Sequence, residues 1–296
     1  MKHRLLITGG SGFVGKNLKE LLADTYSITA PSSKQLNLMD TEKVRAYLRK
    51  NNFDYVIHAA ADVITRNYTK DPTLVLYNNM RMFVNVARCN TLYKRMIYFG
   101  SGAEYDMLHY RPKMKEDYFD THVPQDYYGF SKYLSAKYIE ATDNIIDLRL
   151  FGCFGPYERW QVRFISQSIC KAIFDLDIEI GQNVKFDYLY VKDLAPIVES
   201  LLTKKRLKFH HYNICTGSSV DLRSIAETIK KVSGKNIKIK LVKNGMKKEY
   251  SGDNKRLRSE VKNLQLTPLP VAIAEMFEWY LRQKKNINKK ELMRTL

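Results

Sequence analysis

Tyr128 and Lys132 lie four residues apart in the segment YYGFSK, residues 127–132. In a helix this spacing places both side chains on one face. A nearby lysine ammonium stabilises a phenolate, so we expect it to lower the pKa of the phenol from its ordinary value of about 10. Such a tyrosine is suited to donating a proton near neutral pH. Tyr133 and Lys137 have the same spacing, so spacing alone does not distinguish the two pairs.

Glycines separate the first apolar run of the chain from the first amphipathic segment. Gly9, Gly12 and Gly15 are spaced three apart between a predicted strand and a predicted helix. In dinucleotide-binding turns such glycines permit a tight turn, close approach of the backbone to a pyrophosphate and close packing of helix on strand, and the helix N-terminus receives the anion. We therefore expect a dinucleotide to contact these glycines together with Phe13 and Val14.

The residues after the second predicted strand bear on which dinucleotide binds. An acidic side chain at this position commonly binds the ribose 2′-hydroxyl of NAD. No carboxylate occurs between Tyr26 and Asp40, where Ser32, Ser33 and Lys34 supply hydroxyls and a cation instead. These groups suit a 2′-phosphate, so the sequence favours NADP(H) over NAD(H). The alternative interpretation is that Ser32, Ser33 and Lys34 are ordinary loop residues that do not bind the cofactor.

Short apolar runs alternate with amphipathic segments through the first half of the chain. This alternation predicts an α/β fold with a Rossmann-type, doubly wound parallel sheet. The pattern becomes less regular after residue 156, which predicts a smaller C-terminal α/β substrate domain. We assign residues 1–155, with a returning segment at about 184–204, to the dinucleotide-binding domain, and residues 156–183 and 205–296 to the substrate domain. The predicted strands cover residues 3–8, 26–30, 54–60, 94–100 and 145–152, and the predicted helices between them cover residues 15–24, 40–50, 72–89 and 128–143.

Composition narrows the classes of partner. The net charge is +18, but basic runs lie near the ends of predicted helices, where cations complement the helix dipole, and no nucleic-acid-binding motif occurs. We expect a basic surface that attracts small anionic ligands rather than nucleic acid. The four cysteines show no metal-ligand or disulfide spacing, so neither a metal site nor a disulfide is expected. Apolar runs are too short for a signal peptide or a membrane span, so we expect a cytoplasmic protein without membrane insertion.

Several motifs together resemble the extended short-chain dehydrogenase/reductases that act on nucleotide sugars, the NAD-dependent epimerase/dehydratase family. The glycine spacing and YYGFSK are two of these motifs, and the resemblance extends over essentially the whole chain. The other matching segments are LNLMD at 36–40, VIHAAA at 56–61, Asn79 in its predicted helix, YFGSGAEY at 98–105 and LYVKDLA at 189–195.

The resemblance implies roles for individual residues. Tyr128 would exchange a proton with the substrate, Ser101 would hydrogen-bond the substrate oxygen, and Lys132 would bind the nicotinamide ribose. Tyr133 and Lys137 would then serve packing and the surface. Without the resemblance, Ser101 is better interpreted as a strand-end hydroxyl that caps a turn. The cofactor contacts that the family implies are Asn37 and Leu38 at the adenine, and Ala59, Ala60 and Asn79 along the cofactor.

Departures from the family pattern bear on the reaction. Family 4,6-dehydratases carry Asp-Glu directly after the catalytic hydroxyl, where this chain has Gly102 and Ala103. Residues 36–63 resemble GDP-fucose synthases, which use a cysteine and a histidine for 3,5-epimerisation. The cysteine position is Ala103 here, and the histidine position falls near Arg163. We therefore expect neither dehydration nor 3,5-epimerisation.

The reaction that the resemblance implies is NADPH-dependent reduction, at C4, of a nucleotide-activated 4-keto-6-deoxy hexose for surface polysaccharide synthesis. The resemblance also includes reductases of nucleotide-linked 4-keto-6-deoxy sugars. Two alternative functions stay open: a nucleotide-sugar 4-epimerase that retains its NAD, and a catalytically silent binding module of the same fold. The expected partner is a nucleoside-diphosphate sugar, and a homodimer is one possible assembly. Arg163, Lys185 and Arg256 are candidate contacts to the diphosphate, although each is equally compatible with a surface charge.

Overall fold

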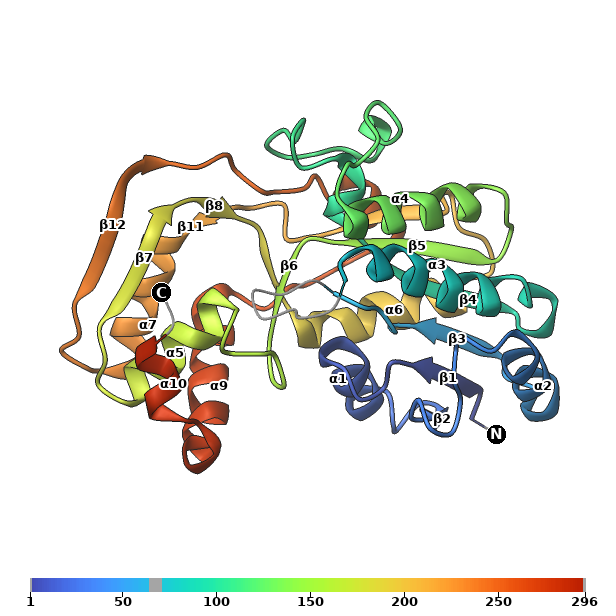
Figure 1. Ribbon diagram of the computed structural model, residues 1–296, viewed down its shortest axis with the longest axis horizontal. Coiled ribbons are helices and arrows are strands. Elements are labelled where there is room, and N and C mark those ends of the chain that lie inside the picture. The colour runs from blue at the N-terminus through green and yellow to red at the C-terminus, as the bar shows by residue number, and fades with distance from the viewer. Residues whose placement is uncertain (1, 64–70, 295–296) are drawn as a thin grey trace.

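The computed structural model describes residues 2–63 and 71–294. Within them a central sheet of six parallel strands has the order β10-β5-β4-β3-β1-β2 (Figure 1). The fold is thus the predicted Rossmann-type α/β fold. The strands are β1 (Arg4–Thr8), β2 (Ser27–Thr29), β3 (Tyr55–His58), β4 (Arg95–Ser101), β5 (Ile145–Leu150) and β10 (His211–Ile214).

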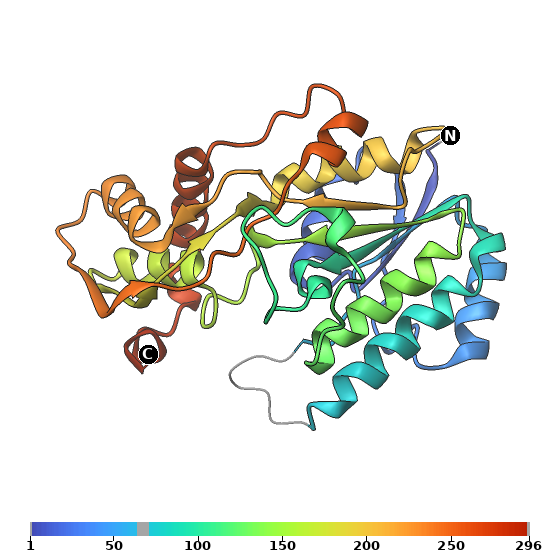
Figure 2. The same cartoon turned by 90° about the horizontal axis from the view of Figure 1, so that it is seen from above.

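Helices cover both faces of this sheet, because its central strands are apolar on both sides. Helices α1 and α6 lie on one face, and α2, α3 and α4 lie on the other, as Figure 2 shows from above. All four residues of β3 are buried, as expected of a strand enclosed by two helical layers. The helices are α1 (Phe13–Leu21), α2 (Thr41–Asn51), α3 (Thr73–Ala87), α4 (Tyr127–Glu140) and α6 (Leu194–Thr203).

The second domain has its own apolar core, in which α5, α7 and α9 pack against one another and α5 and α7 also pack against β7. Its helices are α5 (Phe164–Ile173), α7 (Leu222–Ser233), α9 (Leu269–Arg282) and α10 (Lys289–Arg294), and α8 (Lys255–Glu260) follows the last strand. Its strands are β6 (Gly152–Phe154), β7 (Ile178–Asn183), β8 (Lys185–Phe186), β9 (Tyr188–Tyr190), β11 (Val220–Asp221) and β12 (Ile239–Met246). Short 3-10 helices occur throughout the described chain and are η1 (Asn90–Leu92), η2 (Gly102–Tyr105), η3 (Glu116–Tyr118), η4 (Val191–Asp193) and η5 (Lys284–Asn286).

The domain boundary differs from the predicted one at several elements. Strands β6, β8 and β9 were predicted to lie in the dinucleotide-binding domain, but they pair outside the central sheet, β6 with β9 and β8 with β11. Residues 205–296 were expected to lie wholly in the second domain, but β10 pairs with β5 as the edge strand of the central sheet. Helix α8 packs against β10, and Leu257 joins the core beneath the sheet. Local pattern predicts that a strand forms but does not indicate its pairing partner, which explains the difference.

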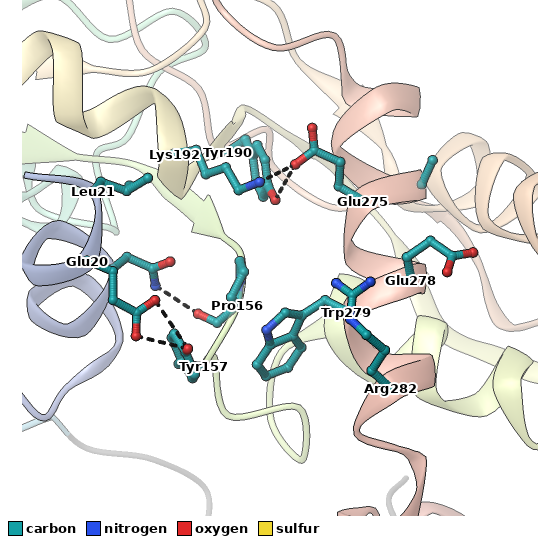
Figure 3. Close-up of a pocket in the computed structure, with 12 residues that line it drawn as sticks. Glu20, Leu21, Pro156, Tyr157, Tyr190, Lys192, Glu275, Glu278, Trp279 and Arg282 are labelled. Atoms are coloured by element: carbon teal, nitrogen blue, oxygen red, sulfur yellow. Dashed lines mark hydrogen bonds and ion pairs between the residues drawn. The ribbon is translucent and has the colours of Figure 1, made fainter.

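A cavity of about 560 Å³ lies where the two domains meet, between α1 and α9 (Figure 3). Tyr157 Oη donates a hydrogen bond to Glu20 at 3.0 Å, and Lys192 Nζ pairs with Glu275 at 2.5 Å. These polar groups bind one another, and neither Ser101 nor Tyr128 lines the cavity. The cavity therefore belongs to the domain contact rather than to the predicted chemistry.

Among the described residues, none of the helices is both long and apolar enough to span a membrane.

Candidate functional site

The glycine turn has the shape that a dinucleotide requires. Gly9 has φ +71°, and a Cβ there would lie 2.6 Å from the backbone nitrogen of Ala60 and 2.7 Å from the carbonyl oxygen of Ala59. A Cβ at Gly15 would overlap the Gly9 carbonyl, so α1 packs directly on the turn. Gly12 precedes α1 and has no side chain to occupy the helix N-terminus. The residues present thus fit a pyrophosphate held by backbone N–H groups.

The residues predicted to select the cofactor follow β2 beside this turn. A Cβ at Gly10 would lie 2.7 Å from the Cβ of Ala30, which brings the end of β2 next to the glycines. Ser32, Ser33 and Lys34 are all exposed, and the Ser32 hydroxyl donates a hydrogen bond to Gln35 Oε1 at 3.0 Å.

The segment predicted to contact adenine lies further along the same edge. A second cavity, of about 460 Å³, is lined there by Asn37 and Arg81 among others. Asn37 Oδ1 accepts a hydrogen bond from Met39 N at 3.0 Å, and the Leu38 carbonyl accepts one from Asn85 at 2.8 Å. Both contacts hold the segment in place beside the cavity.

Asn79 joins the loop after β3 to α4. Its Oδ1 accepts a hydrogen bond from Asp62 N at 2.7 Å, and its Nδ2 donates to the Asp62 carbonyl at 3.0 Å and to Ser131 Oγ at 3.2 Å. Asn79 therefore links Asp62, which follows the predicted cofactor residues Ala59 and Ala60, to the helix that carries Tyr128 and Lys132.

Ser101 lies at the carboxyl end of β4, close enough to Tyr128 for its hydroxyl to act on the pKa of the phenol. Ser101 ends β4, and its Oγ accepts a hydrogen bond from Ala103 N at 3.1 Å. Tyr128 lies in the first turn of α4, where Asp126 caps the helix by accepting from Gly129 N at 2.8 Å. Ser101 thus caps a turn, as its sequence position alone suggested, and it lies beside Tyr128; its catalytic role stays a prediction.

Lys132 lies beneath this pair with only 3% of its surface exposed. Its Nζ donates to the Phe99 carbonyl at 2.6 Å and lies 4.5 Å from the centre of the Tyr98 ring. Burial lowers the pKa of Lys132 to about 8, against the opposing charges of Glu104 and Asp147.

The expected lowering of the Tyr128 pKa is wrong for this structure. Burial raises the pKa of Tyr128, and the polar influence of the Ser101 hydroxyl and the charge of Arg163 only partly oppose that rise. The Lys132 ammonium binds the Phe99 carbonyl and lies 5.8 Å from the centre of the Tyr128 ring, so desolvation outweighs its charge. Tyr128 consequently keeps its proton at neutral pH, as a proton donor requires.

The second pair with the same spacing reaches a different partner. The Tyr133 hydroxyl and the Lys137 ammonium both bind Asp120, the latter at 3.1 Å, and Lys137 also pairs with Glu140 at 2.7 Å. These contacts fasten the segment before α4 to its outer side, away from Ser101.

Three buried charged side chains, Glu104, Asp147 and Arg149, lie beside the carboxyl end of β4 and contact one another. Arg149 Nε lies 2.8 Å from Glu104 and 3.0 Å from Asp147, and Glu104 also accepts a hydrogen bond from Ser101 N at 2.9 Å. All three side chains are 1% exposed or less. Sequence reasoning missed Asp147 and Arg149, although two charges in the apolar run IIDLRL were a signal for a buried ion pair.

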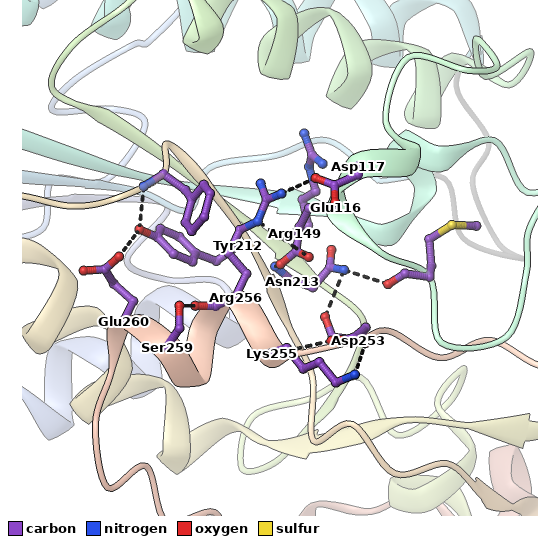
Figure 4. Close-up of polar contacts among 12 residues, drawn as sticks. Glu116, Asp117, Arg149, Tyr212, Asn213, Asp253, Lys255, Arg256, Ser259 and Glu260 are labelled. Carbon is purple, nitrogen blue, oxygen red and sulfur yellow. Dashed lines mark hydrogen bonds and ion pairs between the residues drawn. The ribbon is translucent and has the colours of Figure 1, made fainter.

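The three predicted substrate cations lie in different surroundings. Arg163, just before α5, is exposed and lies 3.9 Å from Glu158, and its charge partly opposes the rise in the pKa of Tyr128. Lys185 is exposed on β8. Arg256 already binds Asp117 and lies 3.9 Å from Glu116 and 4.2 Å from the centre of the Phe209 ring (Figure 4).

Sequence reasoning also missed Tyr250, whose hydroxyl lies beside Gly102, the residue that follows Ser101. Tyr250 comes from the segment between β12 and α8, far from the family motifs, and nothing in its local sequence marks it.

A tyrosine, a serine and a buried lysine close to a glycine turn are the arrangement expected of an extended short-chain dehydrogenase/reductase. The chain belongs to the NAD dependent epimerase/dehydratase family, whose match extends over residues 5–215.

Among its curated relatives, a GDP-L-colitose synthase of Yersinia pseudotuberculosis is 24% identical over 96% of this chain and 99% of the relative. Among solved structures, the GDP-mannoheptose C4 reductase from Campylobacter jejuni with NADP bound matches with a TM-score of 0.81 and 20% identity, covering 94% of this chain and 98% of that chain. A UDP-glucose 4-epimerase from Thermotoga maritima matches with a TM-score of 0.79 and 18% identity, covering 95% and 99% of the two chains. Structural likeness at such identity shows the fold alone.

Proposed function

We propose that this protein reduces a nucleotide-activated 4-keto-6-deoxy hexose at C4, with NADPH as the hydride source. The observation that carries the proposal is the approach of Ser101 and Tyr128 to each other beside the buried Lys132, whose Nζ lies 5.8 Å from the centre of the Tyr128 ring. Gly102 and Ala103 follow Ser101, so the positions that carry an acid, a base or a cysteine in related dehydratases and epimerases hold no group able to move a proton.

The residues of the chain account for the proton side of this reaction. Bound NADPH would supply the hydride that forms the new C–H bond at C4. Tyr128 gives its proton to the carbonyl oxygen, so the ketone becomes an alcohol, and solvent then restores the phenol. Ser101 donates a hydrogen bond to the same oxygen while negative charge develops on it. Lys132 holds the nicotinamide ribose and stabilises the transient phenolate.

Names of relatives support the substrate class. They include a GDP-L-colitose synthase and a GDP-mannoheptose C4 reductase solved with NADP, both of which use GDP-linked sugars by name. We propose a nucleoside-diphosphate sugar as the substrate, with Arg163 near its diphosphate. Ser32, Ser33 and Lys34 support NADP(H) as the cofactor. Cytoplasmic location and a homodimer stay predictions.

A nucleotide-sugar 4-epimerase is the second candidate, because the structure resembles a UDP-glucose 4-epimerase and that reaction also fits a tyrosine, a serine and a lysine. An epimerase of this type returns the hydride to its substrate and keeps its NAD. Retention of the cofactor after dilution therefore separates the two functions.

The test is a screen of GDP-, dTDP- and UDP-linked 4-keto-6-deoxy sugars for oxidation of NADPH and NADH. Calorimetric titration of both cofactors accompanies it, and we expect NADP(H) to bind roughly tenfold more tightly or better, from charge-assisted contacts to the 2′-phosphate. Tightly retained NAD, with interconversion of C4 epimers and no net oxidation of NADPH, would replace the reductase with the epimerase.

A further inference from the structure

Strand β4 loses one of its two strand neighbours before its carboxyl end. The pairing of β3 with β4 ends where His58 lies opposite Tyr98, whereas β5 stays paired with β4 as far as Ser101. Residues two apart in a strand direct their backbone polar groups to the same edge, so the Phe99 carbonyl and the Ser101 N–H face one edge together. Both groups bind side chains there instead of a strand.

Lys132 and Glu104 supply these side chains. Lys132 Nζ donates to the Phe99 carbonyl at 2.6 Å, and Glu104 Oε1 accepts from Ser101 N at 2.9 Å. Ser101 Oγ in turn accepts from Ala103 N at 3.1 Å, so Ser101 and Glu104 form a reciprocal capping box at the start of η2. The backbone and the hydroxyl of Ser101 are therefore held by the same turn.

Glu104 is itself held by a buried arginine. Arg149 Nε lies 2.8 Å from Glu104 Oε2 and 3.0 Å from Asp147 Oδ2, and all three side chains are 1% exposed or less. Arg149 Nη1 also donates to Tyr105 Oη at 3.0 Å, and Tyr105 donates to Asn213 on β10. One oxygen of the Glu104 carboxyl group thus lies on a fixed arginine, which leaves the other oxygen for the backbone of β4.

Gly100 leaves room for this arrangement. A Cβ built on Gly100 would overlap Glu104 Oε1 and Asp147 Oδ1. Any other residue at position 100 would therefore push Glu104 away from Ser101 N. The missing side chain at Gly100 and the hydrogen bond of Glu104 are independent observations that agree.

We propose that Glu104 is a positioning residue for the reduction, which fixes the Ser101 backbone so that the Ser101 hydroxyl lies where it donates to the substrate oxygen. This inference rests on the proposed function. A misplaced hydroxyl loses its hydrogen bond to that oxygen and no longer stabilises the charge that develops on it. The loss of Glu104 should therefore act on kcat through Ser101.

The contact with Ser101 N does not depend on the charge of Glu104. Burial, together with the charge of Asp147, raises the pKa of Glu104 well above its ordinary value. The carbonyl oxygen of a protonated carboxyl group still accepts a hydrogen bond, as does the amide oxygen of glutamine. Glutamine is therefore the conservative replacement, whereas methionine has a similar length and no oxygen.

The first test compares Glu104→Met with Glu104→Gln and Glu260→Met. Glu260 is the matched control, because it is also buried, accepts from Lys208 N at 3.0 Å and pairs with Lys204 at 2.5 Å. We expect Glu104→Met to lower kcat about tenfold or more with little change in the KM for the sugar or in NADPH affinity, whereas Glu104→Gln stays within about threefold of the wild type. An unchanged kcat in Glu104→Met, or an equal loss in either of the other variants, would overturn the proposal.

The second test separates positioning from a general loss of structure. In a Ser101→Ala background no hydroxyl is left to misplace, so Glu104→Met should lower kcat little further. A general distortion of the site would instead lower kcat by the same factor in both backgrounds. Such multiplicative losses would show that Glu104 acts independently of Ser101, and would overturn the proposal.

A third measurement needs no substrate. Hydrogen exchange of the peptide that covers residues 98–105 reports on the Ser101 N–H, which Glu104 protects. We expect this N–H to exchange about tenfold faster or more in Glu104→Met than in the wild type, Glu104→Gln and Glu260→Met. Equal rates in all four proteins would overturn the proposal. Faster exchange in Glu104→Met, where the wild type turns over no 4-keto sugar, would instead overturn the proposed function.

Discussion

Tyr128 and Tyr133 differ in what their hydroxyls reach, although their neighbouring lysines are equally spaced. Tyr128 contacts Ser101 at the end of β4, and Tyr133 binds Asp120 on the outer side of α4. Family resemblance selects the same pair that the structure brings to Ser101. Spacing could not make that choice, because it depends on which residue lies in the first turn of α4.

Tyr128→Phe should lower kcat by about 100-fold to 10,000-fold, because phenylalanine has no hydroxyl proton to transfer to the substrate. Affinity for NADPH should stay nearly unchanged. Tyr133→Phe is the matched control and should keep kcat close to that of the wild type. Steady-state kinetics on both variants checks the assignment, and a larger loss in Tyr133→Phe would reverse it.

The rate of reduction should fall as the pH rises above about 8, the pKa to which burial lowers Lys132. Below that pH Lys132 carries the charge that stabilises the ribose and the phenolate, and above it the charge is lost. Tyr128 keeps its proton over the same range, because burial raises its pKa. The decline in kcat is therefore assigned to Lys132.

A pH profile of kcat from pH 6 to 10 tests this assignment. Lys132→Arg should be less active but should lack the decline near pH 8, since a guanidinium keeps its proton there. If the decline stayed near pH 8 in this variant, another group would be responsible.

At the scale of elements, the first half of the fold could be predicted because each strand and helix carries its own apolar period. The strand ends of β1, β3 and β4 deliver the glycine turn, Ala59 and Ser101 to one edge of the sheet, as open α/β sheets require. Pairing of β10 with β5, and the approach of Tyr250 to Ser101, could not be predicted. Both depend on contacts between segments distant in sequence, which leave no local period.

Gly9→Ala should weaken NADPH binding by tenfold or more and lower the thermal midpoint. Its φ of +71° strains an L-residue, and its Cβ would lie 2.6 Å from the Ala60 nitrogen. Gly181→Ala is the matched control, because a Cβ there would meet no heavy atom of the described chain within 4 Å. Calorimetric titration and thermal unfolding measure both effects, and equal behaviour of the two variants would contradict the role given to Gly9.

At the scale of the whole molecule, both domains contribute to the site. Ser101, Tyr128 and Lys132 come from the Rossmann-type domain, while Arg163 and Tyr250 approach from the second domain. A ketone bound between them would meet hydroxyl donors and a guanidinium. Whether it also meets a base decides between simple reduction and reduction coupled to epimerisation.

Carboxylates and thiols near the site are poorly suited to remove a proton from the sugar ring. Glu104 is bound behind β4 by Arg149, and burial raises the pKa of Cys153 well above its ordinary value, so Cys153 stays a thiol. Glu158 is different, because burial raises its pKa to about 7 and it lies 3.9 Å from Arg163. Its carboxylate accepts from Ser166 Oγ at 2.5 Å, which directs it toward α5.

Reduction in deuterated water should therefore place no deuterium at C3 or C5 of the product. Hydride delivery to C4 needs only the Tyr128 proton and the Ser101 hydrogen bond, whereas exchange at C3 or C5 needs a base over the ring. NMR of the product from a 4-keto-6-deoxy nucleotide sugar, compared with a control without enzyme, measures the exchange. Deuterium above that control would reinstate an epimerase-reductase, and its loss in Glu158→Gln but not in Cys153→Ser would identify the carboxylate next to Arg163 as the base.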